Sequence, residues 1–236
     1  MELVAIARRL RSDVSCLKFA APVAYVYNPL AYAWKPHRAY LERYGRGKRR
    51  VILLGMNPGP FGMAQTGVPF GDIGMVRDWL GIEAPVGHPV RVHPKRAVAG
   101  FRCARGEVSG QRLWGWARDN FVIPQRFFER FFVANYCPLA FIEASGRNRT
   151  PDKLPRAEQA ALFKACDAAL RRTVERLRPE QVVGVGRFAA DRAASALDGT
   201  GVQMGVMPHP SPASPAANRG WAAQATRALE KLGIAL

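Results

Sequence analysis

The chain has 236 residues, of which 35 are Lys or Arg and 18 are Asp or Glu, so its formal net charge is +17 with neutral histidines. Hydrophobic residues make up 48% of the sequence, which is enough for a large core and excludes a mainly disordered protein. The positive surplus predicts a polyanionic partner, nucleic acid first and an anionic membrane surface second. The alternative is a basic protein that has no polyanionic partner.

Neither a membrane span nor a metal centre is indicated. No stretch reaches the roughly 18 apolar residues that a membrane helix needs, and the first residues lack the pattern of a secretory signal. The four cysteines form no Cys-x-x-Cys pair, which argues against zinc or iron–sulfur binding, and unpaired thiols are typical of a reducing compartment. We therefore expect a cytoplasmic, nucleoid-associated bacterial protein without metal or cofactor and without membrane association. Heavy use of Ala and Arg hints at a GC-rich bacterial genome.

The elements predicted from apolar periodicity alternate between helices and strands within a single domain, residues 1–236. An amphipathic helix is expected first, and Pro22, Pro29 and Pro36 should divide the next stretch into loops and short turns. Ser214 is a credible N-cap, with Pro215 at the first position of a helix that ends near Leu232. The other predicted helices cover residues 2–19, 72–80, 156–177 and 188–197, and the predicted strands cover residues 51–54, 131–135, 181–186 and 202–207.

Apolar strands that alternate with helices predict an α/β fold, with a mostly parallel four-stranded sheet covered on both faces in a three-layer α/β/α sandwich. Ligands bind such sheets beyond the carboxyl ends of the strands. Asn57, Asn135 and His209 all follow or end predicted strands. We therefore expect these three distant residues to meet at one edge of the sheet.

The stretch 55–71 contains five glycines and three prolines directly after a predicted strand. Glycine allows close approach of a ligand to the backbone, and proline stiffens the rest, so the stretch is suited to holding a flat ligand. It lacks the Gly-Lys-Ser/Thr ending of a phosphate-binding Walker loop. The alternative is an ordinary connection between a strand and a helix.

The stretch 207–215 holds His209 among four prolines, and its serines Ser211 and Ser214 can bind phosphate oxygens. A rigid polar strand end favours a functional histidine, whereas His37, His88 and His93 lack such a setting and are interpreted as structural or surface residues. Asn135 carries both a donor and an acceptor and could match the edge of a base. Its alternative role is to satisfy a backbone turn.

These stretches together resemble the single-strand-selective monofunctional uracil-DNA glycosylases, which form family 3 of the uracil-DNA glycosylase superfamily. The resemblance runs in order from near residue 20 to the C-terminal helix. Its most specific parts are residues 55–71 and 209–212. It also includes residues 27–29, 32–38, 75–81, 107–110, 145–148 and 218–221.

The resemblance implies hydrolysis of the bond between deoxyribose and uracil, or a 5-modified uracil such as 5-hydroxymethyluracil, in single- and double-stranded DNA. It implies that Asn57 positions the attacking water and that His209 donates a hydrogen bond to the uracil O2. An amide cannot usefully take a proton, so catalysis would depend on positioning and electrostatics. A monomer without a cofactor and without a lyase step is expected.

The same resemblance assigns the residues that hold the base. Asn135 would read N3–H and O4 of uracil, and Phe70 would stack on the flipped base. Met56 and Gly59 would line the C5 side, where the glycine leaves space for a substituent. The alternative for Phe70 is core packing.

One departure concerns the loop expected to fill the gap in the DNA. Animal members carry an arginine after His-Pro-Ser-Pro, and this chain has Ala213, with Arg219 as the candidate substitute. We expect the advantage for single-stranded or mispaired uracil to be retained or increased. A cluster of basic residues is predicted either to contact DNA phosphates or to form a solvated face. Its members are Arg91, Lys95, Arg96, Arg102, Arg105 and Arg112.

Two competing hypotheses come from other classes. A sister family of glycosylases carries an iron–sulfur cluster, for which paired cysteines are lacking here. A catalytically silent nucleic-acid-binding protein on the same fold would bind uracil-containing DNA without forming abasic sites, and the presence of both Asn57 and His209 disfavours it.

Overall fold

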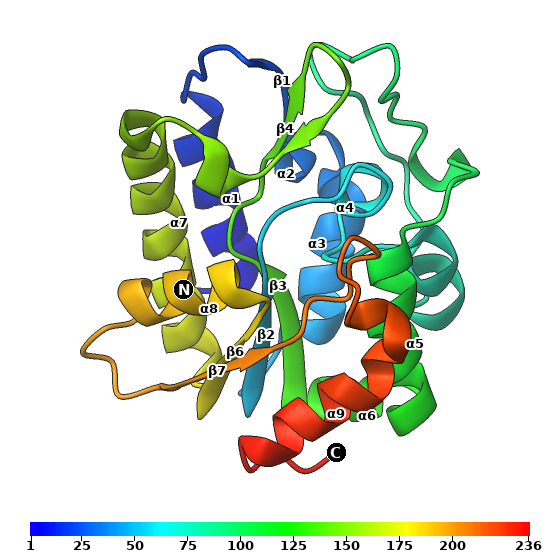
Figure 1. Cartoon of the computed structure of the whole chain (residues 1–236), viewed down its shortest axis with the longest axis vertical. Helices are drawn as coiled ribbons and strands as arrows, with labels where there is room; N and C mark the ends of the chain where they lie inside the picture. The colour runs from blue at the N-terminus through cyan, green and yellow to red at the C-terminus, as the bar shows by residue number, and fades with distance from the viewer.

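A four-stranded parallel sheet with the order β3-β2-β6-β7 forms the centre of the computed structural model, which describes residues 1–236 (Figure 1). Its strands are β2 (Val51–Gly55), β3 (Phe131–Asn135), β6 (Gln181–Val185) and β7 (Gln203–Met207). These bounds confirm the four predicted strands to within one residue at each end. Because all four run parallel, their carboxyl ends lie at one edge, which faces upward in Figure 1.

Helices cover both faces of this sheet and complete a three-layer α/β/α sandwich (Figure 1). On one side lie α1 (Leu3–Ser15), α7 (Arg156–Leu177) and α8 (Arg187–Ala196), and on the other lie α5 (Val108–Phe121), α6 (Pro124–Arg130) and α9 (Trp221–Lys231). All five residues of β2 are buried, as expected for a central strand with neighbours on both sides. The expected fold class is confirmed.

A second, antiparallel sheet lies above the first and has the order β1-β4-β5 (Figure 1). It consists of β1 (Val23–Tyr27), β4 (Ala140–Glu143) and β5 (Asn148–Arg149). The expectation of only loops and short turns around the early prolines was wrong, because β1 begins directly after Pro22. A short helix α2 (Pro29–Tyr32) and the longer α3 (Trp34–Tyr44) follow. Pro36 lies in the first turn of α3, where no intrahelical donor is lost.

Most predicted helices are confirmed, and α7 has the predicted bounds. The stretch 72–80 is helical but contains a π-turn, in which the amide of Leu80 donates to the carbonyl of Met75 over 2.9 Å. The predicted C-terminal helix is present as α9 and ends next to Leu232 as predicted, but its predicted start at Ser214 was wrong. Only a short 3-10 turn, Ala217–Arg219, follows Ser214, and Gly220 at φ +89° separates it from α9. The local signals at Ser214 and Pro215 were outweighed by this left-handed break.

An aromatic cluster fixes the end of the sheet that carries β3. Phe127 of α6 stacks on Phe131 with ring centroids 5.1 Å apart, and Trp116 of α5 meets both rings edge-on. On the other side of β3, the Tyr40 hydroxyl of α3 donates to the Val133 carbonyl over 2.8 Å. β3 is thus held from two directions just before Asn135. None of the helices is both long and apolar enough to span a membrane.

Candidate active site

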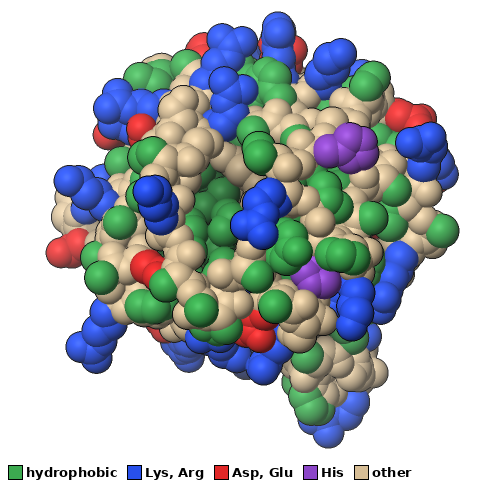
Figure 2. Space-filling view, turned by 90° about the horizontal axis from the view of Figure 1, so that it is seen from above, with side chains coloured by type: hydrophobic (Ala, Val, Ile, Leu, Met, Phe, Trp, Pro, Cys, Tyr) green, Lys and Arg blue, Asp and Glu red, His purple; other side chains and the backbone are tan.

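A polar cavity of about 350 Å³ opens at the carboxyl edge of the parallel sheet. Its volume falls at the lower end of the roughly 300–1,000 Å³ that is usual for small-molecule sites. Figure 2 looks down on the end of the molecule that carries the sheet's loops, where Lys and Arg side chains surround a hollowed surface with few acidic groups. The predicted residues that line the cavity are Met56, Asn57, Gly59, Phe70, Asn135, His209 and Ser211.

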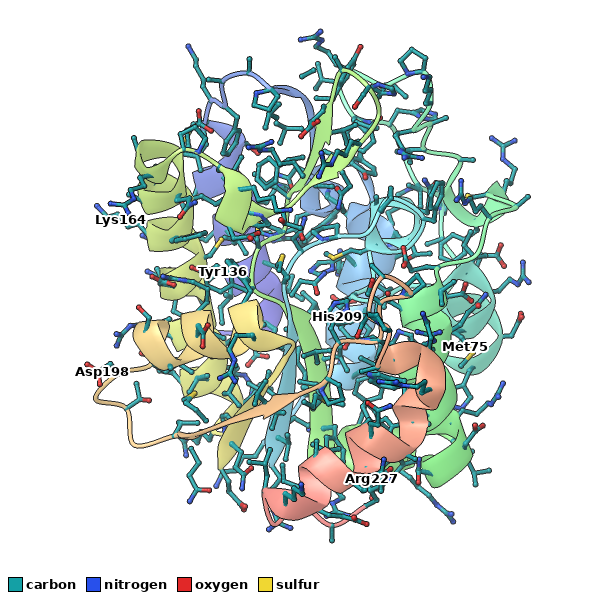
Figure 3. All side chains as sticks on the ribbon, in the orientation of Figure 1. Met75, Tyr136, Lys164, Asp198, His209 and Arg227 are labelled. Atoms are coloured by element: carbon teal, nitrogen blue, oxygen red, sulfur yellow. The ribbon has the colours of Figure 1, made fainter.

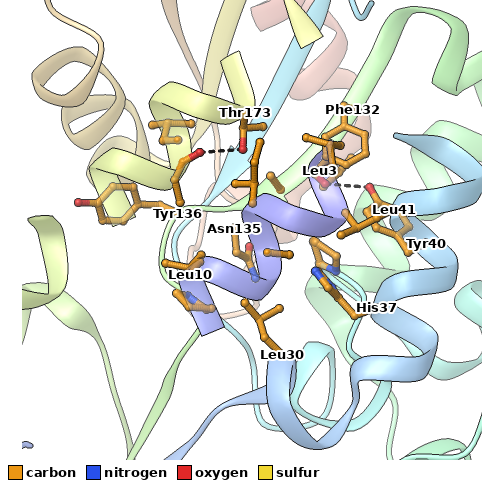
Figure 4. Close-up of a pocket in the computed structure, with 18 of the residues that line it drawn as sticks. Leu3, Leu10, Leu30, His37, Tyr40, Leu41, Phe132, Asn135, Tyr136 and Thr173 are labelled. Atoms are coloured by element: carbon orange, nitrogen blue, oxygen red, sulfur yellow. Dashed lines mark hydrogen bonds between the residues drawn. The ribbon is translucent and has the colours of Figure 1, made fainter. Parts of the chain in front are cut away.

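A second, apolar cavity of about 80 Å³ lies behind this one, between α1, α3, α7 and β3 (Figure 4). Asn135 and Met63 line both cavities, so they form part of the wall between them. The apolar cavity is well below the usual size of a ligand site. Of these two neighbouring cavities, only the polar one therefore offers room for a nucleobase.

Asn57 is held by one end of its amide and free at the other. Its Nδ2 donates to the Leu139 carbonyl over 3.2 Å, which fixes the side chain against the residue that precedes β4. Its Oδ1 has no hydrogen-bond partner within the protein and is available to accept a hydrogen bond in the cavity. This arrangement leaves the Asn57 oxygen able to position a hydrogen-bond donor, such as a water, in the cavity.

Asn135 ends β3, and its position is set by the ladder between β3 and β2. It lies opposite Gly55, and beyond it the amides of Tyr136 and Cys137 donate to the carbonyls of Gly55 and Met56, each over 2.9 Å. The Asn135 Nδ2 contacts the Met63 sulfur at 3.3 Å, a weak acceptor. The amide can therefore exchange this contact for a stronger one with a ligand.

Tyr136, the residue after Asn135, points away from His209 and toward α7 and α8 (Figure 3). Its hydroxyl donates to Asp167 over 2.6 Å, and Arg192 makes two hydrogen bonds to Asp167 at 2.7 and 2.8 Å and one to the Tyr136 oxygen at 3.0 Å. Burial and the hydrogen bond to Asp167 raise the pKa of Tyr136 far above its usual value. This network fixes the backbone directly after Asn135.

His209 has a defined tautomer in this structure. The Ser211 amide donates to its Nδ1 over 3.0 Å, so Nδ1 is the acceptor and the proton of the neutral ring lies on Nε2. Burial lowers the pKa of His209 below its ordinary 6.5, which favours this neutral form at pH 7. The flanking prolines are also tied, because Trp221 donates to the Pro208 carbonyl over 2.8 Å and Arg112 to that of Pro210 over 3.0 Å. The result is a fixed neutral donor at the cavity wall.

Phe70 lies beside His209, with ring centroids 6.0 Å apart and an angle of 43° between the planes. Its backbone has φ +52°, a left-handed conformation that is rare for an aromatic residue and is typical of functional sites. The Phe70 carbonyl packs so closely on Gly110 that a β-carbon there would collide with it. The surroundings therefore hold an energetically unfavourable conformation that places a flat ring at the cavity.

The side of Gly59 on which a side chain would lie is filled by Glu107. A β-carbon at Gly59 would be 2.5 Å from the Glu107 Oε2, so even alanine would displace the carboxyl group. Burial raises the pKa of Glu107, and the nearby Asp72 carboxyl adds to the rise. The space beside Gly59 that the sequence predicts is therefore bounded by a carboxyl group, which the sequence analysis did not include in the site.

The residues predicted to contact DNA do not all lie at the cavity. Ser211 lines it, whereas Ala213 and Arg219 are exposed in the loop beyond, and the Ser214 hydroxyl accepts from the Ala217 amide at 3.4 Å. Among the basic residues, Arg112 holds the His209 loop, and Arg96 donates to the Gly146 carbonyl over 2.7 Å. These two guanidinium groups therefore stabilise the site's loops in addition to adding positive charge.

Four further polar residues line the cavity and were missed as site residues, namely Glu107, Ser109, Asn148 and Thr150. The sequence did contain a signal for Glu107, Ser109 and Asn148, because they belong to residues 107–110 and 145–148, two stretches that carry the family resemblance. Three histidines were predicted to be structural or surface residues, and none of them lines the cavity. His37 and His93 are buried and hydrogen-bonded to backbone carbonyls, and His88 is exposed.

Known proteins provide a direct comparison with this site. A profile of the uracil DNA glycosylase superfamily matches residues 42–232, a range that contains every residue of the polar cavity. The chain belongs to the uracil DNA glycosylase superfamily. Among its relatives in this superfamily, the single-strand selective monofunctional uracil DNA glycosylase of Mus musculus is 52% identical over 228 residues, covering 96% of this chain and 82% of the relative.

Two further relatives match this chain to a similar extent. The single-strand selective monofunctional uracil-DNA glycosylase of Rattus norvegicus is also 52% identical with the same coverage, and that of Bos taurus is 51% identical, covering 96% of this chain and 84% of the relative. A solved structure of wild-type Pedobacter heparinus SMUG2 superposes with a TM-score of 0.66 at 17% identity, covering 97% of this chain and 98% of that one, which shows that the two chains share a fold.

The side chains that could bind a metal are not arranged to hold an iron–sulfur cluster, the group considered for the sister family. No three or more His, Cys, Asp or Glu side chains are grouped so that they could hold a metal ion. Cys137 and Cys166 are buried, whereas Cys16 is exposed.

Proposed function

We propose that this protein is a monofunctional DNA glycosylase that hydrolyses the N-glycosidic bond of uracil and 5-modified uracils in single- and double-stranded DNA. The product is an abasic site, and the protein acts as a monomer without a cofactor. The observation that carries the proposal is the convergence of Asn57, Phe70, Asn135 and His209 on one cavity of base-binding size. Relatives that are named for this activity at 52% identity support it.

The reaction breaks the bond between C1′ of the sugar and N1 of the base. The electron pair leaves with the base, the sugar becomes oxocarbenium-like, and water adds to C1′ while it loses a proton to solvent. Asn57 Oδ1 accepts a hydrogen bond from that water, and His209 Nε2–H donates to O2 as negative charge develops there. No lysine lines the cavity, so no amine is in place for a Schiff base.

Base selection follows from the amide of Asn135. Its oxygen accepts from uracil N3–H, and its Nδ2 leaves the Met63 sulfur to donate to O4. Cytosine has an acceptor at N3 and a donor at C4, so both of these bonds would be lost and polar groups would remain unpaired in the cavity. Phe70 stacks on the flipped ring, and a substituent at C5 lies beside Met56 and Gly59 and against the Glu107 carboxyl group that bounds this space.

The loop after His209 contacts the DNA strand from which the base has left. Ser211 and Ser214 bind phosphate oxygens, and Arg219 adds positive charge. Ala213 offers only a methyl group to fill the vacated stack, so extrusion from a stable base pair is supported weakly. We therefore propose that single-stranded and mispaired uracil are better substrates than uracil paired with adenine.

The test uses single-stranded and duplex oligonucleotides that contain one uracil, followed by alkaline cleavage at abasic sites. Strand breaks that depend on both uracil and alkali support the proposal. Binding of uracil-containing DNA without any abasic product would identify a silent binding protein, and breaks without alkali would indicate a lyase.

A further inference from the structure

One guanidinium group near the polar cavity is held in place without using its hydrogen-bond donors. The guanidinium carbon of Arg105 lies over the Phe61 ring, 4.1 Å from its centre. Arg105 is exposed, and its guanidinium group forms neither a hydrogen bond nor an ion pair with the protein. Stacking engages the flat face of a guanidinium and leaves its N–H donors, which lie in its plane, free to bind an acceptor. Arg105 is therefore available to bind an anion that the protein itself does not supply.

The two stacked side chains belong to segments that form the wall of the cavity. Phe61 lies between Pro60 and Gly62, which both line the cavity, and Arg105 is two positions before Glu107, which lines it too. These segments are in direct contact, because a β-carbon at Gly62 would be only 2.9 Å from the Glu107 Cγ. The stacked pair of Phe61 and Arg105 therefore lies next to the rim of the cavity, by which we mean the residues that border its opening.

Two other arginines near the site use their donors within the protein. Arg96 also lies over the Phe61 ring, with its guanidinium carbon 5.4 Å from the ring centre, but its Nε donates to the Gly146 carbonyl over 2.7 Å. Arg112 donates to a backbone carbonyl of the His209 loop over 3.0 Å. These two guanidinium groups are partly occupied by loop carbonyls, whereas all the donors of Arg105 are free.

We propose that Arg105, stacked on Phe61, binds a backbone phosphate of the DNA strand whose uracil enters the cavity. This inference rests on the proposed glycosylase activity. Because only a sugar separates a base from its phosphates, a uracil inside the cavity brings its neighbouring phosphates to the rim. A guanidinium binds two phosphate oxygens through paired N–H donors. A side chain that is already ordered by stacking loses less conformational entropy on binding than a mobile one, so Phe61 strengthens the contact without touching the DNA.

The experiment measures binding of a single-stranded oligonucleotide with one non-cleavable 2′-fluoro-deoxyuridine, by fluorescence anisotropy, from about 50 to about 200 mM salt. We expect Arg105→Gln to lower the affinity about tenfold at the lowest salt concentration. The slope of log affinity against log salt should become shallower by about 0.7, the change for one phosphate contact on a single strand. Arg227→Gln is the matched control, because it removes the same charge from an exposed position on α9 away from His209 (Figure 3). It should leave affinity and slope unchanged.

Phe61→Leu tests whether stacking positions the guanidinium group. Leucine keeps an apolar side chain in the loop but removes the flat ring, so the affinity should fall about threefold while the salt slope, which reports the charge, stays the same. Arg105→Gln should then lower the affinity less in the Phe61→Leu background than in the wild type. The single-turnover rate of uracil excision at saturating enzyme should fall less than the affinity does in Arg105→Gln, because the phosphate contact acts on binding.

The outcomes separate this inference from the proposed function. A wild-type enzyme that excises uracil, with an Arg105→Gln salt slope equal to its own, would overturn the inference alone. So would an equal loss of slope in Arg227→Gln, or an effect of Arg105→Gln that is the same with and without Phe61→Leu. A wild-type protein that forms no abasic sites in the uracil oligonucleotide would overturn the proposed function itself.

Discussion

Two loops bound the candidate site, and they are built in opposite ways. In the loop between β2 and the π-turn, Ala64, Thr66 and Val68 are completely buried, and His37 binds the Gly67 carbonyl from beneath. In the loop after β7, by contrast, Pro212, Ala213 and most of the following residues are exposed. Local stability follows burial, so the first loop should be rigid and the second able to adapt. Under the proposed function, base chemistry depends on the buried loop together with His209 at the start of the exposed loop, and strand selection depends on the exposed residues beyond His209.

His209 is the point where the two loops meet, and its replacement should have the largest effect. His209→Ala removes the neutral Nε2–H donor, so we expect single-turnover excision to fall about 10²–10³-fold. Binding to a non-cleavable uracil analogue should change by less than threefold. His88→Ala, at an exposed histidine that does not line the cavity, is the control. Equal losses of rate and binding would show that His209 only binds substrate.

Asn135 tests the rigid side of the comparison. Asn135→Ala removes both hydrogen bonds to the uracil edge, and we expect uracil excision to fall about 10²-fold while the difference between uracil and cytosine narrows. The measurement is the excision rate on oligonucleotides that differ only in that base. Asn120→Ala is a matched control, because Asn120 donates to the Trp116 carbonyl at the end of α5. An unchanged ratio of uracil to cytosine excision would contradict the assigned role.

Replacement of His37, which binds the Gly67 carbonyl of the buried loop, tests how this contact affects folding stability at different pH values. Burial lowers its pKa from 6.5 to about 4, so the unfolded chain binds a proton in this range that the folded protein does not. Stability should be highest above pH 6.5 and fall by about 3 kcal/mol as the pH drops from 6.5 to about 4. Asn at this position keeps a donor for Gly67 but does not titrate.

The measurement for His37 is urea unfolding at pH 7 and pH 4.5. His209 also has a lowered pKa and contributes in the same direction, so the slope due to His37 is the difference between wild type and His37→Asn. If both proteins lost the same stability over this range, the buried histidine would have no part in the acid sensitivity.

Ala213 tests the exposed side, with the smallest expected effect. Ala213→Arg supplies a longer side chain to fill the vacated stack, so excision of uracil paired with adenine should rise a few-fold. Excision from single strands should stay within twofold, because no stack has to be replaced there. A rise of equal size on both substrates would instead indicate general electrostatic attraction to DNA.

The sequence predicts well those parts that repeat a local pattern. The strand at residues 131–135 and the helix at residues 156–177 have the predicted bounds, because continuous apolar runs and helical periodicity determine them. The convergence of Asn57, Asn135 and His209 also follows from the sequence, because each residue lies at or just after the carboxyl end of a predicted parallel strand. What the sequence could not predict depends on contacts between distant segments.

Three features show this dependence. The antiparallel sheet joins β1 to β4 across more than a hundred residues, so no local pattern announces it. The left-handed Gly220 overrides the helix-start signals at Ser214. The tautomer of His209 is set by the Ser211 amide, whose direction depends on how the loop folds. Similarly, Asn148 lines the cavity because β5 folds back and pairs with β4.

The distribution of the site along the chain has a consequence for biosynthesis. Asn57 and His209 are 152 positions apart (209 − 57), and the imidazole follows β7, which is the last strand of the sheet in the sequence and lies at its edge. A nascent polypeptide still on the ribosome can therefore contain Asn57 and Asn135 and yet lack His209, the group proposed to stabilise the departing base. Catalytic competence arises only after the edge strand has docked, so an incompletely synthesised molecule should not damage DNA.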